Sequence, residues 1–201
     1  MANKDGVWNE LALIAIAEEG GTDVNYAAMT SSIRITEGGK PCDQISFLDA
    51  SKGVIKRPAG PIEITFEGYP LDADASGGTG VIQHYDSELT RDTTDPFQVD
   101  ATVRRDRYRV CILWTDDTDL TTSAVAAVTL STNSLRYILA NAYMTSHDWE
   151  FTGDGLKVTF AFWAPAVNKG KSTNRRIESV DGAITTGVIT ALASYTSTVN
   201  W

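Results

Sequence analysis

The residues that could carry metal or acid–base chemistry are few and widely spaced. The only histidines are His84 and His147, which lack the i, i+4 spacing that brings two imidazoles to one helix face. The run 116–119 (Asp-Asp-Thr-Asp) offers three carboxylates, but it lacks the glycine and terminal glutamate of a calcium-binding EF-hand loop. A solvated turn between strands is the favoured interpretation of that run. We therefore expect no metal site and no catalytic histidine.

Motifs for nucleotide binding or nucleophilic catalysis are also missing. The glycine-rich run 77–80 (Gly-Gly-Thr-Gly) is not followed by the Lys-Ser/Thr pair with which a phosphate-binding loop contacts phosphate and magnesium. No Gly-x-Ser-x-Gly motif marks a serine nucleophile. These absences predict no cofactor and no enzymatic activity.

The two cysteines, Cys42 and Cys111, are too few for a disulfide scaffold and too far apart for a zinc-ligand pair. A free cysteine behaves as a small buried hydrophobe. We expect two buried, reduced thiols.

Composition indicates a folded and acidic protein. The 201 residues are 42% hydrophobic and carry a formal net charge of −9, so the chain can form a core but does not attract DNA or an anionic membrane through its overall charge. The apolar stretch 11–17 is much shorter than the roughly 20 residues that span a bilayer. We expect no membrane segment, no secretory leader and synthesis in a cytoplasm.

The strongest structural signal has a period of two residues. In the segment 62–68, Ile62, Ile64 and Phe66 alternate with Glu63, Thr65 and Glu67. Successive side chains of a strand point to opposite faces, so this segment predicts a strand with one buried and one wet face. Similar patterns occur at 32–36, 44–48, 107–114 and 157–163. The fold class is therefore mainly β, of sandwich or barrel type.

Turns and helices are harder to locate. The segments 37–41 and 152–155 are rich in glycine and predict turns, the second of them as a hairpin connection to the strand at 157–163. The segment 135–144 fits both a helical stripe and a strand, and 81–89 could hold a short helix. We expect one short helix beside the sheets.

Charge is distributed unevenly. The region 71–96 is an acidic loop region, whereas two other segments are basic. Complementary charges set register and orientation in assemblies, so we expect these segments to meet between neighbouring copies. The candidate inter-subunit residues are Asp72, Asp74, Asp92, Asp95, Arg105, Arg107, Arg109, Lys169, Lys171, Arg175 and Arg176. We assign residues 1–166 to a β-sandwich core and 167–201 to a β-rich arm or extra strands of the same domain.

Several segments, taken together, resemble the major tail (tube) proteins of tailed phages and tailed archaeal viruses. One group is 42–48 (Cys-Asp-Gln-Ile-Ser-Phe-Leu), then 53–58, then 62–69, which is a short strand, a turn and an alternating strand that ends in glycine. The other is 135–145, the turn 152–155 and the Thr/Phe-rich strand 157–163. The pattern extends over much of the chain but contains no invariant motif.

This resemblance implies a β-sandwich subunit whose sheets join between subunits into a tube of stacked hexameric rings. Such a tube is the conduit for genome delivery, so the implied location is the virion tail. The implied partners are further copies of the chain, other tail proteins at the tube ends, and viral DNA that passes without specific binding. A polar sheet face can line an aqueous lumen, which makes Glu63, Thr65 and Glu67 candidates for lumen-facing residues. Acidic side chains there would repel phosphate.

Two alternatives remain at this point. One is a capsid decoration or fibre-like sandwich. The other is a carbohydrate-binding β-sandwich that uses some of the five tryptophans as a platform, although core packing is the favoured role of Trp114 and Trp163. Rings or tubes in images of concentrated protein would distinguish a tube subunit from both alternatives.

Overall fold

The described part of the chain is built entirely of antiparallel strands. The computed structural model describes residues 11–19, 24–27, 30–69, 107–115, 134–153, 155–168, 170 and 172–180. The strands are β1 (Leu11–Glu18), β2 (Val24–Ala27), β3 (Thr30–Glu37), β4 (Cys42–Ser46), β5 (Lys52–Lys56), β6 (Ile62–Gly68), β7 (Tyr108–Thr115), β8 (Ser134–Thr152), β9 (Gly155–Ala164) and β10 (Arg175–Val180). The mainly β prediction is confirmed.

No helix occurs in the described ranges. The segment 135–144, which fitted both patterns, lies within the 19-residue strand β8. The possible helix at 81–89 lies outside the described residues, and so does the acidic region 71–96. Within the described ranges, no helix is long and apolar enough to span a membrane.

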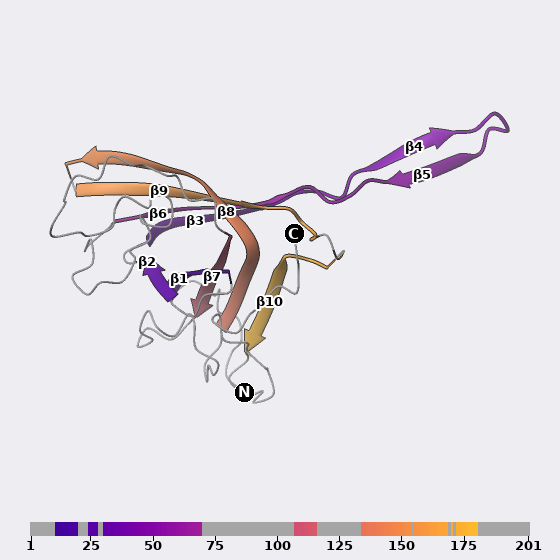
Figure 1. Cartoon of the computed structure of the whole chain (residues 1–201). Helices are drawn as coiled ribbons and strands as arrows, with labels where there is room; N and C mark the ends of the chain where they lie inside the picture. The colour runs from indigo at the N-terminus through magenta and orange to yellow at the C-terminus, as the bar shows by residue number, and fades with distance from the viewer. Residues whose placement is uncertain are drawn as a thin grey trace, which may run out of the picture.

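Strand β8 belongs to two sheets (Figure 1). Its first half pairs with β7 on one side and β10 on the other, and with β1 and β2 these strands form sheet A. Its second half pairs with β9, followed by β6 and β3, and these strands form sheet B. The ladder shifts register between Met144 and Ser146, and Asn141 adopts a positive φ of 53°. Such irregularities bend a strand, which lets β8 pass from one sheet to the other.

The two sheets share a hydrophobic core. Ile62, Ile64 and Phe66 of β6 are buried, as their alternation predicted. The Phe66 ring stacks on Phe160 with centroids 5.0 Å apart, in a range typical of favourable aromatic pairs. Strands β1, β7 and β8 close the core from sheet A.

The central strands of sheet A are buried on both faces. In β7, Ile112 faces the core cluster, and its neighbours Cys111 and Leu113 on the opposite face are fully buried as well. Strands covered on both sides read as continuous apolar runs, which explains why alternation fades along β7.

A long β-hairpin, here called the arm (residues 38–60), leaves one end of sheet B (Figure 1). Strand β3 continues into β4, and β5 returns into β6. The Gly38 amide donates to the Pro61 carbonyl over 2.7 Å, and the Gly60 amide donates to the Gly39 carbonyl over 3.1 Å. A Cβ at Gly38 would overlap backbone atoms of Gly60, so the close approach of the two chains there requires glycine.

The arm corrects two predictions. The glycine-rich segment 37–41 does not reverse the chain, which instead turns at the tip, where Asp49 accepts hydrogen bonds from Ser51 and Ala50 has a φ of 63°. The strand predicted at 44–48 is β4, at 42–46, and its alternating side chains are mostly exposed because no second layer of described residues covers the arm. The strands predicted at 32–36, 107–114 and 157–163, and the hairpin at 152–155, are confirmed.

Candidate functional site

The outer face of sheet B, opposite the core, carries the three lumen candidates. Glu63, Thr65 and Glu67 alternate with the buried residues of β6. Their partners across the sheet are polar or small on β3 and β9, except for Trp163. The pairs are Thr36–Glu63, Arg34–Thr65, Ser32–Glu67, Glu63–Trp163, Thr65–Ala161 and Glu67–Thr159. The outer face of sheet B is therefore a broad and mostly polar surface.

Lys157 on this surface forms ion pairs with glutamates of the two neighbouring strands. The Lys157 ammonium of β9 lies 2.9 Å from a Glu150 carboxylate oxygen on β8 and 3.5 Å from one of Glu67 on β6. The hydrogen bond to Glu150 is the main cause that raises the pKa of Lys157. The face as a whole stays acidic. Its described ionisable residues are Arg34, Glu63, Glu67, Asp148, Glu150 and Lys157, which carry a net charge of −2.

Both lateral edges of sheet B lack a partner strand among the described residues. Strand β3 pairs only with β6, and the second half of β8 pairs only with β9. Free edges expose backbone donors and acceptors that favour pairing with another chain. The two edges belong to different strands, so a contact between them joins different surfaces of two copies.

No protein-family model matches the chain, and no curated protein matches its sequence. A chain of the PVC sheath–tube complex of an extracellular contractile injection system, in its extended state, is similar with a TM-score of 0.51 and 11% identity, over 90% of this chain and 95% of that one. A chain of the anti-feeding prophage (AFP) baseplate is similar with a TM-score of 0.48 and 10% identity, over 92% of this chain and 100% of that one.

The chain has a tube-protein-like fold. At 11% identity, the first of these structures shows a shared fold. The resemblance inferred from the sequence is confirmed at that level.

The basic candidates of this tube-protein-like fold are mostly engaged within the chain. Arg109 was predicted to reach a neighbouring copy, and this prediction is wrong because its side chain is fully buried and donates to the Glu18 carbonyl over 2.8 Å. Burial lowers the pKa of Arg109, and the nearby Glu19 carboxylate opposes this effect. Arg107 is half-buried and donates to Asn141 Oδ1 over 3.2 Å.

Arg175 of β10 links this strand to the root of the arm. Arg175 forms an ion pair with Glu37, the last residue of β3, and the Tyr137 hydroxyl donates to the same carboxylate over 3.0 Å. Burial and this hydrogen bond raise the pKa of Tyr137. Arg176 lies 2.7 Å from Glu178 and is exposed. The remaining inter-subunit candidates are Asp72, Asp74, Asp92, Asp95, Arg105, Lys169 and Lys171, which lie outside the described residues.

A buried ion pair escaped the sequence analysis. Arg136 of β8 is fully buried, and its Nη2 lies 2.7 Å from Glu178 Oε2 of β10. Five residues further along β8, Asn141 Nδ2 donates to Asn174 Oδ1 over 2.8 Å. In the sequence, the one sign of this pair is that Arg136 interrupts the apolar run 135–139. Its partner Glu178 is 42 residues away, so no local spacing connects the two. These contacts join β8 to β10 and to the residue that precedes it.

The cysteines differ in environment, which corrects the prediction that both are buried. Cys42 is exposed on the arm, whereas Cys111 is buried in β7. Burial raises the pKa of the Cys111 thiol to about 12. The thiolate is the reactive form of cysteine, so Cys111 is protected both sterically and chemically.

We expect iodoacetamide at mildly alkaline pH to modify one thiol per native chain and two in denaturant. Mass spectrometry of the labelled protein measures both numbers. The variant Cys42→Ser should lose the native label and keep the one seen in denaturant. Rapid native labelling of Cys111 would contradict its burial.

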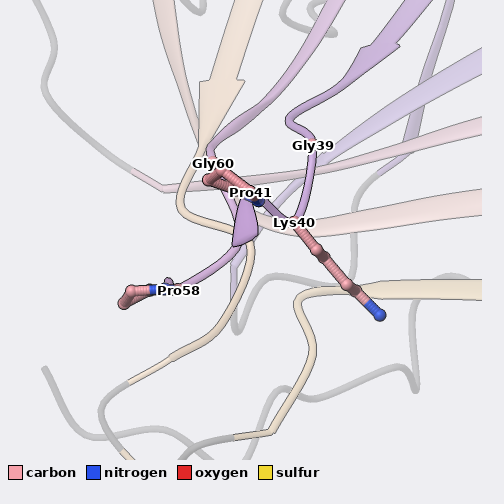
Figure 2. Close-up of a pocket in the computed structure, with 5 residues that line it drawn as sticks. All are labelled: Gly39, Lys40, Pro41, Pro58 and Gly60. Atoms are coloured by element: carbon pink, nitrogen blue, oxygen red, sulfur yellow. The ribbon is translucent and has the colours of Figure 1, made fainter. Parts of the chain in front are cut away.

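The described residues offer little for catalysis or metal binding. A hollow of about 560 Å³ at the arm root is lined by Gly39, Lys40, Pro41, Pro58 and Gly60, and Figure 2 shows Lys40 extending away from Pro58. It contains a single ionisable side chain. No cluster of three or more potential metal ligands occurs within the described ranges.

Proposed function

We propose that copies of this chain join laterally through the edges of sheet B into closed rings, and that the rings stack into a tube. The outer face of sheet B then lines the lumen. One observation carries the proposal: a sheet with an apolar inner face, an acidic polar outer face and two edges, of different strands, that pair with no other strand among the described residues. Contacts between two different surfaces generate rings when the rotation between copies closes.

Strand pairing between copies would also remove the hazard of exposed edges, because a closed barrel has none. The similarity of fold to a chain of a sheath–tube complex supports this reading. The role is structural. We propose hexameric rings in the tail of a virus or of a related injection apparatus, with other tail proteins at the tube ends and genome DNA passing through the lumen.

A carbohydrate platform has less support. Trp149 and Trp163 are partly exposed, but Trp163 pairs with Glu63 on the outer face, whereas Trp149 pairs with the buried Val158 on the core-facing side. Side chains on opposite faces of a sheet cannot form one platform. The expected core role of Trp163 is corrected by this position, and that of Trp114 is confirmed because it packs against the core. Trp8 and Trp201 lie outside the described residues.

The lumen assignment predicts a change in DNA binding. Glu63→Lys combined with Glu67→Lys should leave assembly intact, since water-facing substitutions and the loss of a partly exposed ion pair such as Lys157–Glu67 each usually change stability by no more than about 1 kcal/mol. The lysine-lined wall should retain DNA at low salt and release it as salt rises, because neutralised phosphates release counterions. Cosedimentation of DNA with assembled tubes, followed by nuclease digestion, measures retention inside the tube.

Two matched variants complete this experiment. Glu63→Gln with Glu67→Gln should retain less DNA than the lysine pair, because it removes the negative charge and adds no positive charge. Thr173→Lys with Ser179→Lys adds two lysines at exposed positions outside sheet B, so any DNA it binds should remain sensitive to nuclease. Equal protection by this last variant would contradict the lumen assignment. Concentrated wild-type protein that shows neither rings nor tubes by negative stain would contradict the proposed function as a whole.

A further inference from the structure

The arm exposes apolar side chains that nothing in the described chain covers. Its tip and strands carry Ile45, Phe47, Leu48, Val54 and Ile55 with exposed fractions from 39% to complete exposure. A two-stranded ribbon is at best marginally stable alone in water. Contiguous exposed apolar surface marks interaction sites.

These side chains are sorted onto two faces by the β4–β5 register. Ile45 pairs with Gly53, and the Phe47 ring covers Gly53 so closely that a Cβ there would lie 2.8 Å from the ring. Ile55 shares this face because it pairs with Asp43, two residues before Ile45. We call Ile45, Phe47, Ile55 and the tip residue Leu48 the arm patch. The opposite face carries both lysines of β5 together with Val54.

The arm also differs in charge from the rest of the protein. Between Gly38 and Gly60 there are four basic residues and two carboxylates, a net charge of +2, in a chain with a net charge of −9. The arm is therefore attracted to the remainder of another copy, while the remainders of two copies repel each other.

The opposite end of sheet B carries a second exposed apolar group. The arm leaves one end of the sheet, and the β8–β9 hairpin forms the other (Figure 1). Near this hairpin, Trp149 is 47% exposed and Phe151 is 85% exposed, although their register places them on the core-facing side. Asp148 and Glu150 flank them and are exposed. We call Trp149 and Phe151 the hairpin patch.

We propose that the arm patch of one copy packs on the hairpin patch of a copy in the next ring. This inference rests on the proposed function and names the site that stacks the rings. Strands in a barrel tilt by about 35–45° to its axis, so sheet edges face neighbours in a ring while strand ends face the rings above and below. Both patches are apolar, and the positive net charge of the arm is opposite in sign to Asp148 and Glu150 beside the hairpin patch. Each copy offers both, so the contact repeats without closing, as a tube requires.

Variants of the arm patch test this stacking contact. Phe47→Asp combined with Leu48→Asp should yield single rings with little or no stacking by negative stain, because two charges enter a dry contact. Val54→Asp is the matched control on the opposite face of the arm, and it should form tubes as wild type does. Phe151→Asp should abolish stacking in the same way, whereas Ile177→Asp, at an exposed apolar position on β10, should not. All four proteins should keep the wild-type thermal midpoint.

Crosslinking identifies the two partners directly. In a Cys42→Ser background, Leu48→Cys and Phe151→Cys proteins are assembled separately and as a mixture, and then treated with a short bifunctional maleimide. The covalent dimer should form in the mixture and be absent from either protein alone.

The outcomes separate this inference from the proposed function. Tubes of normal length in the arm-patch and Phe151→Asp variants, or no covalent dimer in mixed tubes, would overturn the stacking contact and leave the ring proposal standing. Wild-type protein that forms rings but never stacks would overturn it as well. Wild-type protein that forms no rings would contradict the proposed function itself.

Discussion

Replacing Phe66 with alanine is expected to lower the free energy of unfolding by about 3–5 kcal/mol, the usual range for a buried phenylalanine. Phe66 is fully buried in β6 and contacts the rings of Phe160 and Phe162 at centroid distances of 5.0 and 6.0 Å. Truncation removes this aromatic stack and leaves a cavity between the sheets. Denaturant unfolding followed by tryptophan fluorescence measures the change.

The matched control is Phe47→Ala, the same truncation at the arm, where the side chain is 53% exposed. It should change stability by about 0.5 kcal/mol or less, as surface substitutions usually do. Similar losses in the two variants would mean that Phe66 does not fill the core between the sheets. Because Thr65 and Glu67 flank Phe66 on the outer face, assembly of Phe66→Ala should weaken together with its fold.

Removing the buried carboxylate by Glu178→Ala should also be strongly destabilising, by about 3–5 kcal/mol, because breaking a buried ion pair from one side takes away the opposite charge and leaves the desolvation cost of the other. Arg136 is fully buried, and its Nε and Nη2 lie 3.1 and 2.7 Å from Glu178 Oε2. The expected structural result is loosening of β10 from β8. Denaturant unfolding gives the free energy, and hydrogen exchange of β10 amides reports the loosening.

Two comparisons make this result specific. Asp43→Ala breaks the Asp43–Arg57 ion pair of the arm, where both side chains are exposed, and should change stability by no more than about 1 kcal/mol. The double variant Arg136→Met, Glu178→Leu should recover most of the loss, since apolar replacement of a buried ion pair is often nearly neutral. A Glu178→Ala protein as stable as wild type, with unchanged protection of β10, would contradict the anchoring role of the pair.

The proposed tube uses three regions of the subunit in different ways. The edges of sheet B would join neighbours in a ring, its outer face would contact the lumen, and its two ends would stack rings. The buried Arg136–Glu178 pair contributes to none of these contacts directly. It joins β10 to β8 in sheet A, on which sheet B packs.

The sequence determined those parts of the fold in which one face of a strand is buried and the other is wet. In β6 the alternation of Ile62, Ile64 and Phe66 with polar residues sufficed, because each side chain's environment follows from the two-residue period alone. The same reasoning located β9 and its hairpin with β8.

The tertiary structure alone decided features that depend on distant partners. Arg109 and Arg136 are buried because other strands supply an acceptor at Glu18 and a carboxylate at Glu178, and no local pattern encodes such pairs. The segment 37–41 has the composition of a turn, yet its glycines serve the close approach of two extended chains, since Gly38 meets Gly60 across the arm. Local sequence fixes which way a side chain points along a strand, but what it meets there depends on chain segments far away in sequence.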